Sequence, residues 1–287
     1  MEKERRRSSS PSPYTSPLYF FVVALSFAWD IIEIMKTQKK LIVGNWKMNP
    51  RTILEARKIF SAVKTASVTL KKTEVVMCPP AVFLGCLGNA GKSALGAQNI
   101  HFEKEGAFTG EISAGMIASM KVKYVILGHS ERREMGETDE FIAKKVISAI
   151  TAGLTVVLCV GEKMRDEECV YLETLQTQIK ASLAGVTKEM LKKLVIAYEP
   201  VWAIGVKATG VATAESFLET GIFIRKVLAG MYDQPSAHAM KILYGGSADE
   251  KNSESFMKEG GAGGLLVGRA SVDAKKFVAI LKIAESI

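Results

Sequence analysis

The sequence predicts a single (β/α)8 barrel preceded by an N-terminal extension. From Lys40 onward, short apolar runs rich in Val, Ile and Leu alternate with helical stretches, and eight such runs occur. Near-continuous apolar strands separated by helices are typical of a parallel sheet that is covered on both faces. Eight such units in about 250 residues fit a closed barrel. We expect the barrel to occupy residues 35–287 and the extension residues 1–34.

Each expected strand ends in Gly or in a polar cluster, and the eight runs cover residues 41–46, 74–80, 93–99, 123–130, 155–162, 193–200, 241–247 and 263–271. A doubly wound sheet is the rival fold, and it normally places a G-x-G-x-x-G turn after its first strand. The first run instead ends in Gly44-Asn45-Trp46-Lys47. The barrel is therefore the better prediction.

Two helices between these runs show clear signals. In residues 50–66 the apolar side chains recur at helical spacing on one face, namely Ile53, Ala56, Ile59, Phe60 and Val63. A second helix is predicted to begin at Thr138-Asp139-Glu140, because negative charge is favourable near a helix N-terminus. No further linker or repeat interrupts the pattern, so we expect one domain after the extension.

Composition places the chain among globular proteins, with 48% hydrophobic and 24% charged residues in 287. The formal charge is +8, and all of it lies after residue 34, mostly as dispersed lysine. Such a surface can steer an anionic substrate, although a merely solvated lysine-rich surface explains it as well. No basic stripe with interleaved aromatic residues occurs, so we expect no nucleic-acid partner.

The cysteines and histidines do not form metal or disulfide patterns. Four scattered cysteines without a C-x-x-C pair indicate reduced thiols and a cytoplasmic protein. The three histidines lack ligand spacing with Cys or acidic residues, so no metal site is expected.

Residues 1–34 admit three interpretations. A polar Ser/Pro-rich opening is followed by the apolar run Leu18–Trp29, which is shorter than the roughly 20 residues that cross a bilayer. We therefore expect no membrane partner. The basic cluster and apolar run mimic a secretory signal. A disordered or loosely docked extension is the second interpretation. In the third, Met35 is the true start.

Polar residues at the ends of the predicted strands are the candidates for catalysis, because the working residues of such barrels project from these ends. They are Asn45, Lys47, Gln98, Asn99, His129, Ser130, Glu131, Glu162, Glu199, Ser247, Gly268 and Arg269. Each also has a structural interpretation. Lys47 is either a fixed cation for an anionic substrate or a solvated lysine at the rim.

His129 and Glu199 carry the strongest chemical signals. His129 precedes what looks like a first helical turn, and a helix N-terminus favours a neutral imidazole that can donate a hydrogen bond to a substrate oxygen. A hydrogen-bonded structural histidine is the alternative. Glu199 ends an apolar strand just before Pro200, where an unpaired charge is costly. It is either a general base or one half of a buried ion pair, for example with an arginine.

Two loop regions complete the candidate site. The segment after Glu199 is rich in small residues and suits a lid that excludes water, or an ordinary loop. Glycines at Gly245-Gly246-Ser247 and at Gly263-Gly264 and Gly268 follow or form the last two strands. Barrels often bind phosphate there through backbone N–H groups.

These residues resemble the triosephosphate isomerase family. The matching runs, in order, are VGNWKMN (43–49), AQN (97–99), GAFTGEIS (106–113), ILGHSERR (126–133), CVGE (159–162), YEPVWAIG (198–205), LYGGS (243–247) and LLVGRAS (265–271). The resemblance covers the chain from about residue 38 to its end. It implies a (β/α)8 barrel enzyme that interconverts dihydroxyacetone phosphate and glyceraldehyde 3-phosphate without cofactor or metal. It also implies a homodimer with Gly106–Ser113 as the interface loop.

The resemblance assigns roles to particular positions. It implies that Glu199 is the base, His129 the neutral electrophile, and Lys47 and Asn45 the groups that hold substrate and enediolate. Glu131 resembles the acid that positions the cation. The residues that resemble the phosphate-binding positions of the family are Gly205, Ser247, Gly268 and Arg269.

The chain differs from the family pattern at two functional places. The lid after Gly205 runs from Val206 to Ala212 and is two residues longer than usual, and Arg269 stands where the family has a second glycine. Two rivals stay open: another phosphate-binding barrel enzyme such as a Schiff-base aldolase, and a non-catalytic binding or scaffold protein.

Overall fold

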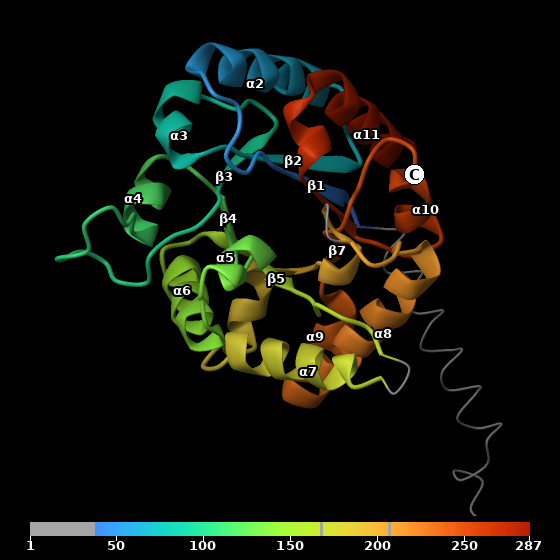
Figure 1. Ribbon diagram of the computed structural model, residues 1–287. Coiled ribbons are helices and arrows are strands. Elements are labelled where there is room, and N and C mark those ends of the chain that lie inside the picture. The colour runs from blue at the N-terminus through green and yellow to red at the C-terminus, as the bar shows by residue number, and fades with distance from the viewer. Residues whose placement is uncertain (1–37, 167–168, 206–207) are drawn as a thin grey trace, which may run out of the picture. The chain divides into compact units, whose positions relative to one another are not determined.

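The computed structural model describes residues 38–166, 169–205 and 208–287. The N-terminal extension expected at residues 1–34, and its boundary at residue 35, lie outside the described residues. In the described part, eight parallel strands form a closed barrel in the order β1 to β8, and helices surround the strands (Figure 1). The predicted (β/α)8 barrel is confirmed.

Each predicted apolar run coincides with one strand to within one residue at its start, as β1 and β2 show. The strands are β1 (Lys40–Asn45), β2 (Thr73–Cys78), β3 (Ala94–Ala97), β4 (Tyr124–Leu127), β5 (Thr155–Val160), β6 (Leu194–Tyr198), β7 (Ile242–Tyr244) and β8 (Gly264–Val267). β1 pairs with both β2 and β8, and this pairing closes the barrel. The polar or glycine residues that end each run lie just past the strand, where the chain leaves the sheet.

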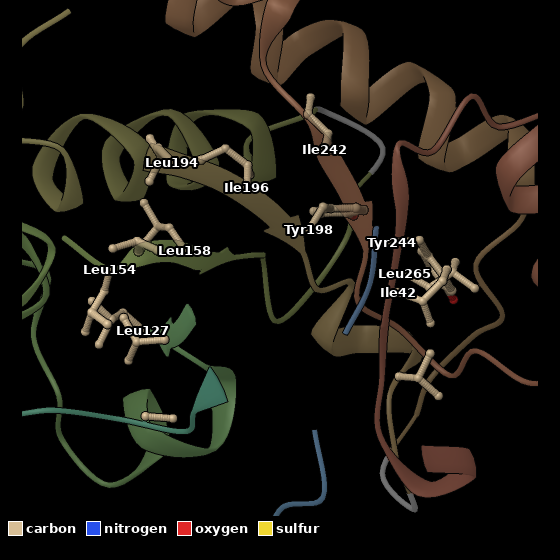
Figure 2. Close-up of a cluster of buried hydrophobic side chains, with 14 of the residues drawn as sticks. Ile42, Leu127, Leu154, Leu158, Leu194, Ile196, Tyr198, Ile242, Tyr244 and Leu265 are labelled. Atoms are coloured by element: carbon tan, nitrogen blue, oxygen red, sulfur yellow. The ribbon is translucent and has the colours of Figure 1, made fainter. Parts of the chain in front are cut away.

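The strand side chains divide into two sets by alternation, because successive strand residues point to opposite faces. One buried cluster contains only strand residues, such as Leu41, Val43 and Ala197, and fills the barrel interior. The other contains the alternate residues together with helix residues such as Phe60. Figure 2 shows strand members of this outer set, among them Ile42, Leu127, Leu158, Ile196, Tyr198, Ile242, Tyr244 and Leu265.

The helices cover the outer set of strand residues. They are α2 (Ile53–Ser67), α3 (Ala81–Leu87), α4 (Ala114–Ser119), α5 (Ser130–Glu134), α6 (Asp139–Thr151), α7 (Tyr171–Ser182), α8 (Ala214–Met231), α9 (Gln234–Ala239), α10 (Ser253–Lys258) and α11 (Ala274–Ser286). The 3-10 helices are η2 (Glu189–Lys193), η3 (Val201–Ala203) and η4 (Arg269–Val272). Apart from the residues outside the described ranges, every helix is too short or too polar to traverse a bilayer.

The two helices predicted from sequence form as expected. α2 begins after Thr52, whose hydroxyl accepts from the Glu55 N–H while the Glu55 carboxylate accepts from the Thr52 N–H. This capping box satisfies two N–H groups that a helix start leaves without partners. Its predicted apolar face is buried at Ala56, Ile59, Phe60 and Val63. α6 begins after Thr138, with Asp139 and Glu140 in its first turn.

Candidate active site

A cavity of about 930 Å³ opens at the carboxyl ends of the strands. Its lining comes from segments that follow β1, β4, β6, β7 and β8. Every residue to which the family resemblance gives a role lines it: Asn45, Lys47, His129, Glu131, Glu199, Gly205, Ser247, Gly268 and Arg269. Closing the barrel therefore brings together residues that are far apart in the sequence.

Glu199 directly follows the carboxyl end of β6, and it is only 2% exposed. Its Oε2 accepts a hydrogen bond from the backbone N–H of Ser130 at 2.8 Å, and its Oε1 lies 3.1 Å from Nε2 of His129. Within the described ranges no arginine or lysine forms an ion pair with Glu199. The geometry therefore favours the general base over the buried ion pair.

His129 occupies the N-cap position of α5, as its sequence context predicts. Its Nδ1 accepts a hydrogen bond from the backbone N–H of Glu131 at 3.2 Å. A ring nitrogen that accepts carries no proton, so the hydrogen bonds assign the proton of the neutral ring to Nε2. The Nε2–H then points at Oε1 of Glu199.

Lys47 has a φ of 52°, a backbone conformation that few non-glycine residues adopt. Two side chains hold it. Its N–H donates to Oδ1 of Asn45 at 3.0 Å, and its carbonyl accepts from Nε2 of Gln98 at 2.8 Å. The Lys47 ammonium pairs with Glu131 Oε1 at 2.6 Å. Backbone strain of this kind is often found at functional sites, and here it directs a cation into the cavity.

The segments expected to bind phosphate lie along the same cavity. Gly205 has a φ of 75°, and Ser247 follows β7. Gly268 lies beside the Lys47 side chain, since a Cβ atom on it would be in van der Waals contact with Cε of Lys47 at 3.4 Å. Arg269 begins η4 and is exposed. The Lys47 ammonium and the backbones of the loops after β6, β7 and β8 therefore line one part of the cavity.

Three other predicted strand-end residues do not line this cavity. Gln98 supports Lys47 and also donates to the carbonyl of Cys78 at 2.8 Å. Asn99 accepts from Nζ of Lys145 at 3.0 Å. Glu162 is 1% exposed and accepts from Tyr198 and Trp202 at 2.7 and 2.9 Å. Gln98 therefore supports the site through Lys47, and Glu162 holds the segment after Glu199 through Trp202, whereas the bond of Asn99 joins it to α6.

The segment expected to act as a lid is only partly described. Val206 and Lys207, which contain part of the apparent insertion, lie outside the described residues. Beyond them, the Thr209 N–H donates to the carbonyl of Trp202 at 2.7 Å. A Cβ on Gly210 would lie 2.9 Å from the Trp202 ring. Trp202 therefore connects this segment to the buried carboxylate of Glu162.

Sequence reasoning missed the glycines that make room for Glu199. A Cβ on Gly161 would lie 1.7 Å from the Glu199 carbonyl oxygen, and a Cβ on Gly245 would lie 3.0 Å from its Cγ. Both follow neighbouring strands, β5 and β7, and flank the end of β6. The available signal was a glycine directly after an apolar strand, but its role depends on which strands are neighbours.

The thiol of Cys159 lies behind Glu199. Burial raises the pKa of Cys159 well above its usual range, and the nearby Glu199 carboxylate raises it further. The thiol is therefore neutral at physiological pH and adds no second negative charge beside Glu199.

Comparison with protein families identifies one family that the chain matches. The family model described as "Triosephosphate isomerase" matches residues 40–284 of the chain. The match begins at the first residue of β1 and ends in α11, so it spans the complete barrel.

Proposed function

The chain belongs to the triosephosphate isomerase family, and we propose that Glu199, His129 and Lys47 carry out its reaction. The enzyme interconverts dihydroxyacetone phosphate and glyceraldehyde 3-phosphate, a step of glycolysis. The observation that carries the assignment is the hydrogen-bonded array of Glu199, His129 and the Glu131 N–H, which lies in the same cavity as Lys47.

Glu199 is the base in this proposal. It removes a proton from the carbon next to the substrate carbonyl, the electron pair moves onto the carbonyl oxygen, and the proton returns to the neighbouring carbon. Nε2 of His129 lies 3.1 Å from Oε1 of Glu199. When a substrate oxygen takes that hydrogen bond, one Glu199 oxygen is released from its donor and becomes more basic. Substrate binding thus activates the base and polarises the carbonyl together.

The enediolate that forms carries negative charge, and two groups stabilise it. The Nε2–H of His129 donates to one oxygen, and the Lys47 ammonium supplies a cation that Glu131 positions at 2.6 Å. Donors that are fixed before reaction stabilise developing charge without reorganisation. Asn45 contributes by holding the unusual backbone conformation of Lys47 at 3.0 Å.

The phosphate group of the substrate is proposed to bind at Gly205, Ser247, Gly268 and Arg269. Backbone N–H groups are suited to a phosphate, since they need not be desolvated as full charges are. These positions line the same cavity as Glu199. We propose no cofactor or metal, because positioned acid–base groups and donors suffice for the proton transfer.

We further propose a homodimer in the cytoplasm. The chain between β3 and α4 extends away from the barrel (Figure 1), and Phe108 at 42% exposure lies within Gly106–Ser113. An exposed aromatic residue on a projecting loop suits insertion into a second copy. The free thiols of Cys78, Cys86, Cys159 and Cys169 agree with a reducing compartment.

The Schiff-base aldolase is not favoured by this geometry. Such an enzyme needs an unprotonated lysine in the barrel. Lys47 lines the cavity and is ion-paired with Glu131 at 2.6 Å. Lys276 is the other described lysine that lines the cavity. It belongs to the first turn of α11 and does not lie beside Glu199.

A coupled isomerase assay on wild type and on the Glu199→Gln variant tests the proposal. The amide keeps the shape of the side chain but cannot accept the proton, so we expect kcat to fall about 10²- to 10⁴-fold. Glu74→Gln is the matched control, because Glu74 belongs to β2 at the opposite end of the barrel and accepts from Tyr124. Inactive wild type, or equal activity in wild type and Glu199→Gln, would refute the assignment.

A further inference from the structure

A group of lysines lies at the amino-terminal end of the barrel, opposite the catalytic cavity. The segments that lead into the strands contain Lys39, Lys71, Lys72, Lys92, Lys121, Lys123, Lys188, Lys192, Lys193 and Lys241. Acidic residues at this end are fewer, namely Glu74, Glu189, Asp233, Glu259 and Glu285. Because all the strands are parallel, these segments share one end of the barrel, which we call the basic face.

Most of these lysines are exposed and many have no ionic partner. Lys188 pairs with Asp233. In the part of the chain that the structure describes, the other ion pairs involve none of the residues Lys39, Lys71, Lys72, Lys121, Lys123 and Lys192, which are all exposed. The Glu285 carboxylate accepts hydrogen bonds from the backbone N–H groups of Lys71 and Lys72. These bonds hold the backbone of the two lysines in place.

The positive charges at this end also crowd one another. Burial, and then the neighbouring Lys241, lower the pKa of Lys40. Lys241 in turn donates to the carbonyl of Lys39 at 2.7 Å. A cavity of about 650 Å³ opens here, and its charged lining residues are Lys188, Lys192 and Lys241 together with Glu74 and Glu189. The exposed lysines outnumber the carboxylates at this end, so an anionic partner is favoured there.

The arrangement of the lysines indicates the shape of that partner. They lie on segments that lead into β1, β2, β3, β4, β6 and β7, around most of the barrel end. A flat anionic surface can meet all of these segments together, whereas a single extended chain meets only some. Val68 and Met120 lie among the lysines and are 56% and 40% exposed, and such side chains can enter a lipid interface.

We propose that the basic face binds the surface of bilayers that contain anionic phospholipids. This differs from the expectation of no membrane partner, which concerned a spanning segment. Clusters of lysine attract anionic headgroups, and the attraction decays within the Debye length. Nucleic acid is less favoured, because the exposed aromatic residues of the described chain, Phe108 and Phe141, belong to other segments and offer no stacking surface here. The catalytic cavity opens at the other end and stays accessible.

Cosedimentation of the full chain with phosphatidylcholine vesicles, with and without phosphatidylserine, tests this proposal. We expect binding only to the anionic vesicles, with loss at about 0.5 M salt. Replacing Lys71 and Lys72 by Gln should weaken binding about 25-fold, since each lysine near such a surface is worth about a fivefold change. Lys121→Gln with Lys123→Gln, on a different segment, should give a similar loss.

The matched control is Arg57→Gln with Lys58→Gln. These residues are exposed on α2 and their replacement removes the same net charge. Binding of this variant should change less than twofold. Isomerase activity should persist in all three variants, which shows that the barrel is folded. Absence of binding to anionic vesicles, or equal weakening in the control, would overturn the proposal. Binding to polyglutamate or RNA but not to vesicles would overturn it in favour of a different partner.

Discussion

Replacing Gly161 by Ala tests whether the position of Glu199 is what the reaction requires. A Cβ at residue 161 would lie 1.7 Å from the Glu199 carbonyl oxygen. Real Cβ atoms essentially never lie under 3.0 Å from another heavy atom, so the two must separate by about 1.3 Å. Since the obstructing atom belongs to the backbone, no side-chain rotation relieves the contact. The ends of β5 and β6, the second of which carries Glu199, must therefore move apart.

The size of this movement sets the expected loss of activity. Glu199 is held by contacts of 2.8 Å to Ser130 and 3.1 Å to His129, and a shift of about 1.3 Å breaks both. A misplacement of about 1 Å can reduce a rate about 100-fold. We therefore expect kcat of Gly161→Ala to fall at least about 100-fold, or about 2.7 kcal/mol in the activation barrier. KM should change less, because the phosphate end of the cavity is formed by other loops.

Three further glycine variants provide a graded series for the same coupled assay. Gly230→Ala is neutral by geometry, because nothing lies within 4 Å of its Cβ. Gly245→Ala should be intermediate, with contacts of 3.0 Å to Glu199 Cγ and 3.1 Å to the Tyr198 carbonyl. Gly264→Ala meets the Leu41 backbone at 1.9 Å, and should lower the unfolding midpoint without displacing Glu199.

The order of the kcat values in this series shows whether the reaction requires Glu199 to keep its position. A folded Gly161→Ala variant with wild-type kcat would show that the reaction tolerates movement of β6, and the reasoning would fail. If Gly161→Ala does not fold, Gly245→Ala still tests it, since its kcat must then lie below that of Gly230→Ala. Circular dichroism and unfolding midpoints separate lost packing from a displaced base.

Three other predictions concern the supports around the site. Gln98→Leu removes the donor to the Lys47 carbonyl and should raise KM and lower kcat several-fold; unchanged kinetics would mean that Asn45 alone holds Lys47. Arg225 is 4% exposed, its Nε has no hydrogen-bond partner, and burial lowers its pKa to about 10, a cost of about 3 kcal/mol. The substitution also removes its charged hydrogen bonds to the Gly221 and Met240 carbonyls, and a bond of this kind is worth about 1.5–3 kcal/mol. The two contributions nearly offset each other, so Arg225→Met should change the urea midpoint little, and a large fall would contradict this. Lys188 and the Ser236 N–H lower the pKa of Asp233 to about 2, so its stabilisation is present above its ordinary pKa of 3.8 and is lost as pH falls towards 2. Asp233→Asn should therefore lower the urea midpoint at pH 6 but not near pH 2, and an equal effect at both pH values would count against the charge.

The fold could be predicted because its signal is local. Each strand is an apolar run with a glycine or polar end, and each helix has its own face and cap, as Thr52 and Thr138 show. The burial of Arg225 had no such signal, since a basic residue within a helix is ordinarily solvated. The packing of α8 against α9 and Met240 explains it, because Arg225 donates to the Met240 carbonyl just after α9 and to the Gly221 carbonyl on its own helix.

The supports of the site could not be predicted, because they depend on contacts between distant segments. Gln98 was recognised as a strand-end residue, but its bond to Lys47 joins positions 51 residues apart. The role of Gly161 depends on the pairing of β5 with β6, which places Val160 beside Tyr198. A strand pattern gives the direction of a side chain within its own strand and no information about its neighbour's backbone.

Glu162 and Glu199 show what can be predicted about a strand-end carboxylate from the alternation of side chains along a strand. Both are carboxylates that follow an apolar strand, and sequence reasoning kept both as candidates. Cys159 points into the barrel, so counting by twos makes Gly161 an inner position and Glu162 an outer one. Ala197 also points inward, and the same count makes Glu199 inner. The period of two therefore separates the base from the buried support, but only once one residue per strand is known to face the interior. That knowledge comes from the closed barrel, since both faces of its strands are equally apolar.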